Sequence, residues 1–416
     1  MNSDHVFQLF YVGQLVYLLS LRKFFITYFS NSFSSGLVLD GVFSKYLSRK
    51  NTKYIYICWI ASNILALFGS QYLSLISAIT IFIFSRYFFI YLRYKSIGRG
   101  NGAPGFMSYW TIKYSLYFQI FTFLEIDSDL IFLVMKIDFA MIMLSAGYYK
   151  QRTGYLRGRG IEYGLRNKMW SWAYVFFTQR SNSALLFKIL NFASIGIEYL
   201  LFVSLLVPGM GKFAGIQLLV MFFFLLVFVR LGTLPVTMFL LSIVLFFSEN
   251  ISYQLILRGE YKEFAIAYIL LLALSIVWNW IFFFKVKIPF WMSWILRTAN
   301  LITGSLIWSV FSASLTENFI EIVRFEGTKE FEVRGKDYGV HSGITLTTIA
   351  TYTNYFPASK EIQELRLLHY LKCLFPGNQV LFVRFKKLKL TNNGNYYSVE
   401  KSWKFDSAEN TLLRIS

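Results

Sequence analysis

The chain has 416 residues, of which 56% are hydrophobic, 20% are aromatic and only 15% are charged. This composition excludes an ordinary soluble globular protein and indicates an integral membrane protein. The net charge is +19, but the last hundred residues hold 14 basic and 11 acidic residues, so +16 belongs to the apolar part. Attraction to anionic lipids explains this charge, so the expected partners are membrane lipids and not nucleic acid.

Mainly apolar runs recur through residues 1–313. Most have the roughly 17–25 residues that a helix needs to cross a hydrocarbon core of about 30 Å. We therefore expect an all-α polytopic membrane bundle of about nine or ten transmembrane helices. The expected spans are 7–26, 54–70, 72–92, 106–125, 128–147, 184–207, 213–230, 232–248, 263–285 and 291–312. Arg22 and Lys23 interrupt the first span, so nine crossings after an interfacial first helix is the alternative.

Residues 317–416 have a different character, because the long apolar runs end and charges of both signs mix with Gly, Asn and Thr. This part predicts a small, water-facing α+β domain. Alternating apolar and polar residues predict strands over 343–352 and 379–390, and an Asn-Asn-Gly turn predicts a hairpin from the second strand to 396–405. A helix is expected over 359–375, where Ser359 can cap its first turn.

Short connections rich in Lys and Arg mark the cytoplasmic side of a membrane protein. With ten helices, these connections are 27–53, 93–105, 148–183, the one near 231, and 286–290, and the connections on the other side carry acidic residues. The pattern predicts a multi-pass protein of the cell membrane with segment 148–183 in the cytoplasm. It also predicts an extracytoplasmic C-terminal domain that can bind a protein or peptide partner.

Cofactor signals are few in this chain. Two Cys and three His residues leave no spacing typical of a zinc, haem or iron–sulfur site. No metal site is therefore expected.

Ionisable side chains inside apolar spans are costly and usually face a cavity or each other. Lys113 and Asp138 lie near the middles of two consecutive, antiparallel spans, at depths that permit a buried pair. Such a pair can be structural, or it can handle protons or substrate. Glu198 has no evident partner in its own helix, and we expect it to be protonated and hydrogen-bonded within the bundle.

Segment 145–172 concentrates Lys and Arg residues directly after one apolar run, and the strongly aromatic stretch 169–177 follows. Arginines can hold a phosphate or carboxylate, and Trp suits the headgroup region of a membrane. The candidate substrate-binding residues are Arg152, Arg157, Arg159 and Trp170. The alternative is an ordinary basic cytoplasmic loop followed by an interfacial helix.

The same segment holds, in order, Gly147, Lys150, Tyr155, Gly158, Leu165 and Trp170. This spacing resembles the segment shared by vitamin K-dependent gamma-carboxylases and the bacterial family with the horizontally transferred transmembrane domain. A later stretch, "IEYLLFVSLLVPGM" followed by "RLGTLP", is similar to that family's second half, where a Glu and a Pro flank a span. The resemblance covers about residues 5 to 312.

The resemblance implies that Lys150 is the base that deprotonates a reduced quinone, which is then the expected cofactor or substrate. Loss of water at a membrane-embedded site favours a neutral amine, which can accept a proton. The chain departs from the family because no His lies between His5 and His341, and Tyr155 stands where Trp is usual. Lys150 also falls on the predicted cytoplasmic side. These departures argue against glutamate carboxylation itself.

Two classes of function remain open. The first is a membrane-bound enzyme that acts on a lipophilic or quinone-type substrate, with Lys150 as base and the arginines as anion binders. The second is a noncatalytic export, immunity or assembly factor whose external C-terminal domain binds a partner. A transporter is a weaker alternative, because the sequence has no internal repeat and no paired broken helices. The substitution Lys150→Ala separates the first two, because only the enzyme should lose activity.

Overall fold

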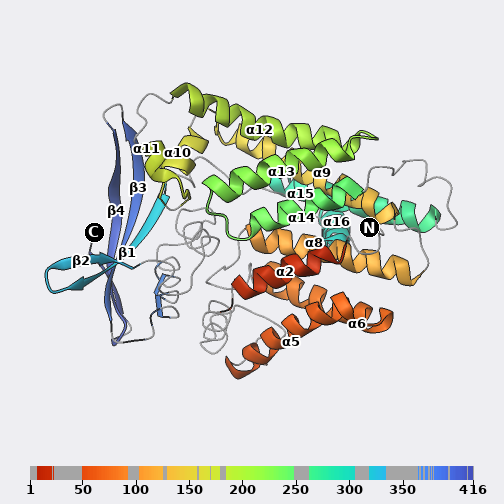
Figure 1. Ribbon diagram of the computed structural model, residues 1–416, viewed down its shortest axis with the longest axis horizontal. Helices are drawn as coiled ribbons and strands as arrows, with labels where there is room; N and C mark the ends of the chain where they lie inside the picture. Colours follow the sequence, from red (N-terminus) through yellow and green to blue (C-terminus); the bar gives the residue numbers. More distant parts are fainter. Residues whose placement is uncertain are drawn as a thin grey trace.

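The computed structural model is a helical bundle with an antiparallel sheet at one end (Figure 1). It describes residues 7–20, 22, 49–91, 103–124, 129–156, 159–168, 170–178, 184–247, 262–304, 318–333, 364, 367–368, 371–372, 375, 377, 379–391, 394–409 and 411–415.

A helix occupies each of the ten apolar runs. In chain order these helices are α2 (Leu9–Ser20), α5 (Arg49–Phe68), α6 (Gln71–Ser85) continued by the π-helix η2 (Arg86–Tyr91), α8 (Ala103–Phe123), α9 (Asp129–Arg152), α12 (Ala184–Leu206), α13 (Gly211–Phe228), α14 (Leu234–Phe247), α15 (Lys262–Phe284) and α16 (Phe290–Thr303). Two short helices, α10 (Gly160–Arg166) and α11 (Tyr174–Thr178), lie between α9 and α12.

Four helical segments among the described residues are long and apolar enough to cross a membrane: Gln71–Phe88, Leu130–Arg152, Leu185–Leu206 and Gly211–Phe228. These segments differ in how much of each is buried inside the protein. The buried share is 83% for the segment in α9, 33% for that in α12 and 28% for that in α13. Helix α9 is therefore central. Helices α12 and α13 are peripheral and expose apolar side chains such as Phe192 and Phe223.

Helix α2 packs inside the bundle, against α5, α8 and α14. Phe7, Phe10 and Tyr11 are fully buried, and the Phe7 ring stacks on Phe118 with centroids 4.5 Å apart. The first helix therefore packs on its neighbours through an apolar and aromatic face, which lies against α8.

Helix α16 is shorter than the expected span 291–312, because it ends at Thr303. Gly304 caps it in the left-handed conformation, with φ 62°. This end lies beside the middle of α8, where the Nζ atom of Lys113 is 3.5 Å from the carbonyl oxygen of Gly304.

The sheet has the strand order β2-β1-β3-β4-β5, and all its pairs are antiparallel. The strands are β1 (Asn318–Glu326), β2 (Lys329–Glu332), β3 (Val380–Thr391), β4 (Gly394–Asp406) and β5 (Thr411–Arg414). The predicted hairpin is confirmed, because β3 and β4 join through the pair Thr391↔Gly394. The β1–β2 hairpin was not predicted, although "NFIEIVRFE" before a Gly-Thr turn carries a strand signal.

Other predictions for the C-terminal part are only partly visible. Residues 364, 367–368 and 371–372 are helical, within the predicted helix 359–375, and the predicted strand 343–352 lies outside the described residues. Leu367 and Leu371 share a buried cluster with β3 and β4. The described residues thus agree with a small α+β unit.

The sheet lies at the end of the bundle that carries α10 and α11, as Figure 1 shows. Side chains of β1 contact Lys168, which follows α10. This contact places the sheet beside segment 148–183, whereas the prediction puts the two on opposite sides of a membrane. Helix α16 begins near Phe284, which packs on Tyr148 at this same end, and the chain returns to it at β1.

Candidate functional site

A cavity of about 300 Å³ lies where α10, α12 and α13 meet the end of α9. We call it the Lys150 cavity. Its walls are almost entirely apolar and its polar side chains gather at one end. The lining residues are Lys150, Tyr155, Ile161, Gly164, Leu165, Trp170, Leu190, Ala193, Ser194, Ile197, Glu198, Val220, Met221, Phe224, Leu225, Val229 and Leu231.

The polar end of the cavity is a buried ion pair. The Nζ atom of Lys150 lies 2.6 Å from Oε1 of Glu198, and the two side chains are only 10% and 8% exposed. Oε2 of Glu198 is buried and has no hydrogen-bond partner among the described residues. The hydrogen bond expected for Glu198 within the bundle is thus made with Lys150. Its partner is 48 positions away in the chain and on another helix.

The turn after α9 folds Tyr155 over this pair. Gly154 has a positive φ of 74°, which lets the chain reverse at the end of α9. The Tyr155 ring centroid lies 5.6 Å from Nζ of Lys150. Gly160 lies directly against the Tyr155 ring, so that a Cβ atom there would clash with it. The amide of Ile161 then donates to Oδ1 of Asn191 on α12, which closes this side of the cavity.

Tyr155 keeps its proton in this setting. Burial raises the pKa of the Tyr155 hydroxyl above its ordinary value, and the nearby carboxylate of Glu198 raises it further. A hydroxyl in such surroundings remains a hydrogen-bond donor at physiological pH.

Backbone hydrogen bonds fasten Trp170 to the end of α13. The carbonyl oxygen of Trp170 accepts from the amide of Arg230 at 2.7 Å, and Ser171 forms an isolated antiparallel bridge with Val229. Trp170, Val229 and Leu231 therefore form one wall of the cavity. Trp170 is only 2% exposed, whereas Trp172 is 59% exposed.

The mouth of the cavity opens on the outer, apolar side of the bundle. Among its lining residues, Ala193 of α12 and Val220 of α13 are exposed. Exposed Ile189, Phe192 and Phe223 surround them on the same two helices. A molecule would thus enter between two apolar helix faces.

The predicted substrate-binding residues divide into two groups. Trp170 lines the cavity together with Lys150. Arg152 instead is exposed and lies 5.3 Å from the Phe284 ring centroid, and Arg159 is an exposed side chain paired with Glu162. Neither lines the Lys150 cavity, because both side chains leave the turn on its outer side. Arg157 lies outside the described residues.

A second buried polar cluster forms around Asp138. Its Oδ2 atom accepts hydrogen bonds from Lys113 Nζ at 2.8 Å, Trp110 Nε1 at 2.9 Å and Tyr114 Oη at 2.6 Å. Lys113 and Asp138 are both 0% exposed. The pairing expected from their depths is confirmed. Three donors and full burial suit a structural role that joins α8 to α9.

No metal centre is visible among the described residues, where no three His, Cys, Asp or Glu side chains come together. The polar side chains of the Lys150 cavity can form hydrogen bonds and transfer protons. A carboxylate oxygen without a partner can accept a proton, and the ammonium group beside it stabilises the carboxylate's negative charge.

Fold and cavity together define a mainly helical protein with apolar helices long enough for a membrane, a C-terminal antiparallel sheet and one amphiphilic cavity between peripheral helices. Neither protein-family models, nor curated proteins, nor solved structures match this chain. The carboxylase-like resemblance of residues 147–170 therefore stays a prediction.

Proposed function

We propose that this protein is a polytopic protein of the cell membrane that binds a lipophilic molecule in the Lys150 cavity. Support for membrane insertion comes from the four long apolar helices and from shorter apolar helices such as Leu234–Phe246 and Ile266–Phe282. Large apolar side chains on the outer helix faces, among them Leu185, Phe192 and Phe223, would meet lipid there instead of water.

We further propose nine crossings, made by α2, α5, α6 with η2, α8, α9, α12, α13, α14 and α15. Helix α16 is not counted, because its capping residue Gly304 lies beside Lys113 in the middle of α8. Under this arrangement the basic connections and the sheet share one side. Because basic connections favour the cytoplasm, the sheet would be cytoplasmic and the start of α2 would face outward.

The ligand class follows from the walls and the polar end of the cavity. Apolar side chains would hold a ring or chain, and the Lys150–Glu198 pair would meet a polar head that can donate a hydrogen bond to Oε2 of Glu198. The reduced quinone implied by the family resemblance fits these residues, because it combines an apolar body with hydroxyl groups. The unpartnered Oε2 atom is the observation that carries the proposal.

If the protein is an enzyme, the Lys150–Glu198 pair makes Glu198, and not Lys150, the candidate base. Nζ of Lys150 already donates a hydrogen bond to Glu198 at 2.6 Å. The open acceptor is Oε2 of Glu198. We therefore propose Glu198 as the group that takes a proton from a bound hydroxyl, with Lys150 holding the carboxylate in position.

A cavity-filling variant tests the proposal. The purified protein in lipid nanodiscs would be titrated with a benzoquinone that carries one isoprenoid unit, in its reduced form. Ala193→Trp should abolish binding because Ala193 lines the cavity, whereas Leu200→Trp, also exposed on α12, should bind normally. Equal binding by both variants would refute the site, and no binding by the wild type would refute the ligand class.

A second candidate function is the noncatalytic assembly factor. The sheet carries four apolar side chains that are each at least half exposed. Tyr396 and Val399 belong to β4, Leu413 belongs to β5, and Ile415 follows β5. They offer a surface for a protein partner, which would be cytoplasmic in the arrangement above. Pull-down with the wild type and with Val399→Lys would test it, because a charge there should break an apolar contact.

A further inference from the structure

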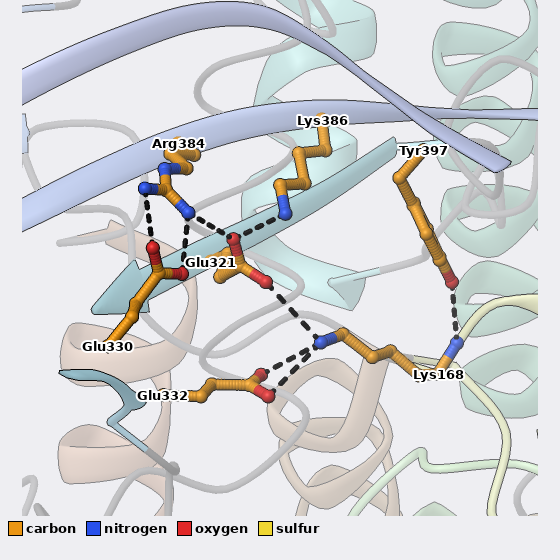
Figure 2. A network of polar contacts seen from close by, with 7 residues as sticks. All are labelled: Lys168, Glu321, Glu330, Glu332, Arg384, Lys386 and Tyr397. Carbon is orange, nitrogen blue, oxygen red and sulfur yellow. Dashed lines mark hydrogen bonds and ion pairs between the residues drawn. The ribbon is translucent and has the colours of Figure 1, made fainter.

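Seven polar residues connect the sheet with the chain beyond α10 (Figure 2). We call them the Lys168 network: Lys168, Glu321, Glu330, Glu332, Arg384, Lys386 and Tyr397. Glu321 of β1 is nearly buried, and three cations surround it: Lys386 Nζ at 2.5 Å, Arg384 at 3.5 Å and Lys168 Nζ at 3.6 Å. Arg384 also binds Glu330 through two hydrogen bonds of 2.6 and 2.8 Å.

Lys168 is the member of this network that belongs to the α9–α12 connection, and the sheet contacts it in three ways. Nζ lies 3.1 Å from each carboxylate oxygen of Glu332. Nζ also lies 4.4 Å from the ring centroid of Phe319, and the backbone amide donates to the Tyr397 hydroxyl at 3.2 Å. Ammonium, ring and backbone contacts together fix both the side chain and the main chain of this residue.

The chain from Lys168 to the cavity wall is two residues long. The carbonyl oxygen of Asn167, the residue before Lys168, accepts from the amides of Trp170 and Ser171, each at 3.1 Å. Trp170 in turn accepts from Arg230, between the cavity-lining residues Val229 and Leu231. A backbone hydrogen bond from Trp170 to Asn167 thus links the residue next to Lys168 with the cavity wall.

We propose that Lys168 is a positioning residue for the Lys150 cavity, and that the sheet regulates ligand affinity by holding Lys168. The proposal rests on the proposed binding function. When the sheet is docked, Trp170 is held against the end of α13 and the wall is complete. When the contacts to Lys168 are lost, the wall loosens. By linkage, a bound ligand stabilises the docked sheet to the same extent.

The contacts of Lys168 set the expected loss of ligand affinity when its ammonium group is removed. Lys168 and Glu332 are 24% and 44% exposed, so each ion pair contributes modestly, and the contact with Phe319 adds a similar amount. Together they predict a loss of about 5- to 30-fold in affinity when the ammonium group is removed.

The test uses the full-length protein in nanodiscs and the same reduced benzoquinone probe. Lys168→Met should bind it about 5- to 30-fold more weakly. Lys168→Arg should bind nearly as wild type, and the double variant with Glu332→Gln should be no weaker than Lys168→Met alone. Lys329→Met, an exposed lysine of β2 outside the network, is the control. Unchanged binding by Lys168→Met, or an equal loss with Lys329→Met, would overturn the coupling.

A readout without ligand separates this proposal from the binding function. Hydrogen exchange at the amides of Trp170 and Arg230 should speed up in Lys168→Met and stay slow in Lys329→Met, because only the first change frees the wall. Unchanged exchange in Lys168→Met refutes the coupling even if no ligand binds. Faster exchange together with absent probe binding in the wild type supports the coupling and refutes the ligand class.

Discussion

Lys150 and Glu198 join the last turn of α9 to the middle of α12 by a 2.6 Å ion pair inside an apolar cavity. Burying this pair away from water is costly for each charge, and the cost is offset only while both partners are present. The same ion pair therefore stabilises the packing of α12 on α9 and supplies the polar groups of the cavity.

Removing one partner of this pair should be strongly destabilising. We expect Lys150→Met to lower the free energy of unfolding by about 3–5 kcal/mol, because Glu198 is left buried and unpaired. The double variant Lys150→Met with Glu198→Gln should recover most of this loss. Thermal unfolding in detergent micelles measures it, with the exposed Lys188→Met on α12 as control, expected within about 0.5 kcal/mol of wild type. A single variant as stable as the double would contradict the buried pair.

The Asp138 cluster gives a parallel prediction. Asp138→Asn keeps the shape but leaves the fully buried Lys113 without a carboxylate, so we expect a loss of about 3–5 kcal/mol in unfolding free energy. Adding Lys113→Met should restore part of it. The matched control is Glu263→Gln, an exposed acid in the first turn of α15, measured in the same thermal assay. Full stability of Asp138→Asn would mean that the cluster is open to water.

Gly160 should be essential for the shape of the cavity. A methyl group at this position meets the Tyr155 ring, so Gly160→Ala should displace Tyr155 and destabilise the protein. Gly196→Ala on α12 meets nothing and should be neutral or stabilising, since Ala favours a helix by up to about 1 kcal/mol over Gly. Melting temperatures of the two variants provide the comparison, and equal values would show that Tyr155 yields freely.

The placement of the sheet predicts a labelling pattern in cells. In a background with Cys58→Ser and Cys373→Ser, Arg159→Cys and Glu409→Cys should react with an impermeant maleimide from the same side. Gln71→Cys, at the α5–α6 turn, should react from the opposite side. Residues 159 and 409 labelling from different sides would contradict the docking of the sheet on the α9–α12 connection.

The Arg384–Glu330 pair makes sheet stability depend on acid pH. The hydrogen bonds from Arg384 lower the pKa of Glu330 below its ordinary value of 4.5. Because the folded pKa is the lower one, the pair stabilises the sheet at neutral pH, and this contribution is lost as the pH falls below about 5 and through the folded pKa.

We expect Glu330→Gln to lower sheet stability by at most about 1 kcal/mol at pH 7, since the pair is exposed to water. The difference from wild type should vanish at acid pH. Protease susceptibility of the sheet across pH measures this, with the exposed Glu409→Gln as control. A difference that grows on acidification would reverse the sign of the argument.

Several features were predictable because they depend on local pattern. Apolar run lengths located the helices, although not their ends. The alternation in 379–390 and 396–405, with a turn between, predicted the β3–β4 hairpin. Lys113 and Asp138 could be paired because consecutive spans are antiparallel, so two mid-span residues reach the same depth.

The Lys150–Glu198 pair and the Lys168 network could not be predicted in this way. Their partners come from elements far apart in the chain, and no period in the sequence says which faces of α9 and α12 meet. The contact between the sheet and Lys168 was not predicted for a related reason. An apolar run of the right length does not reveal that its helix stops at Gly304, beside Lys113.

The sequence by itself therefore determined a lipid-compatible helical chain with a polar, strand-rich C-terminal part, because hydrophobic length and alternation are properties of neighbouring residues. Only the tertiary structure decided that Glu198 faces Lys150, that Trp170 closes a cavity and that the sheet docks on Lys168. Those contacts depend on helix rotation and on the number of crossings, and packing sets both.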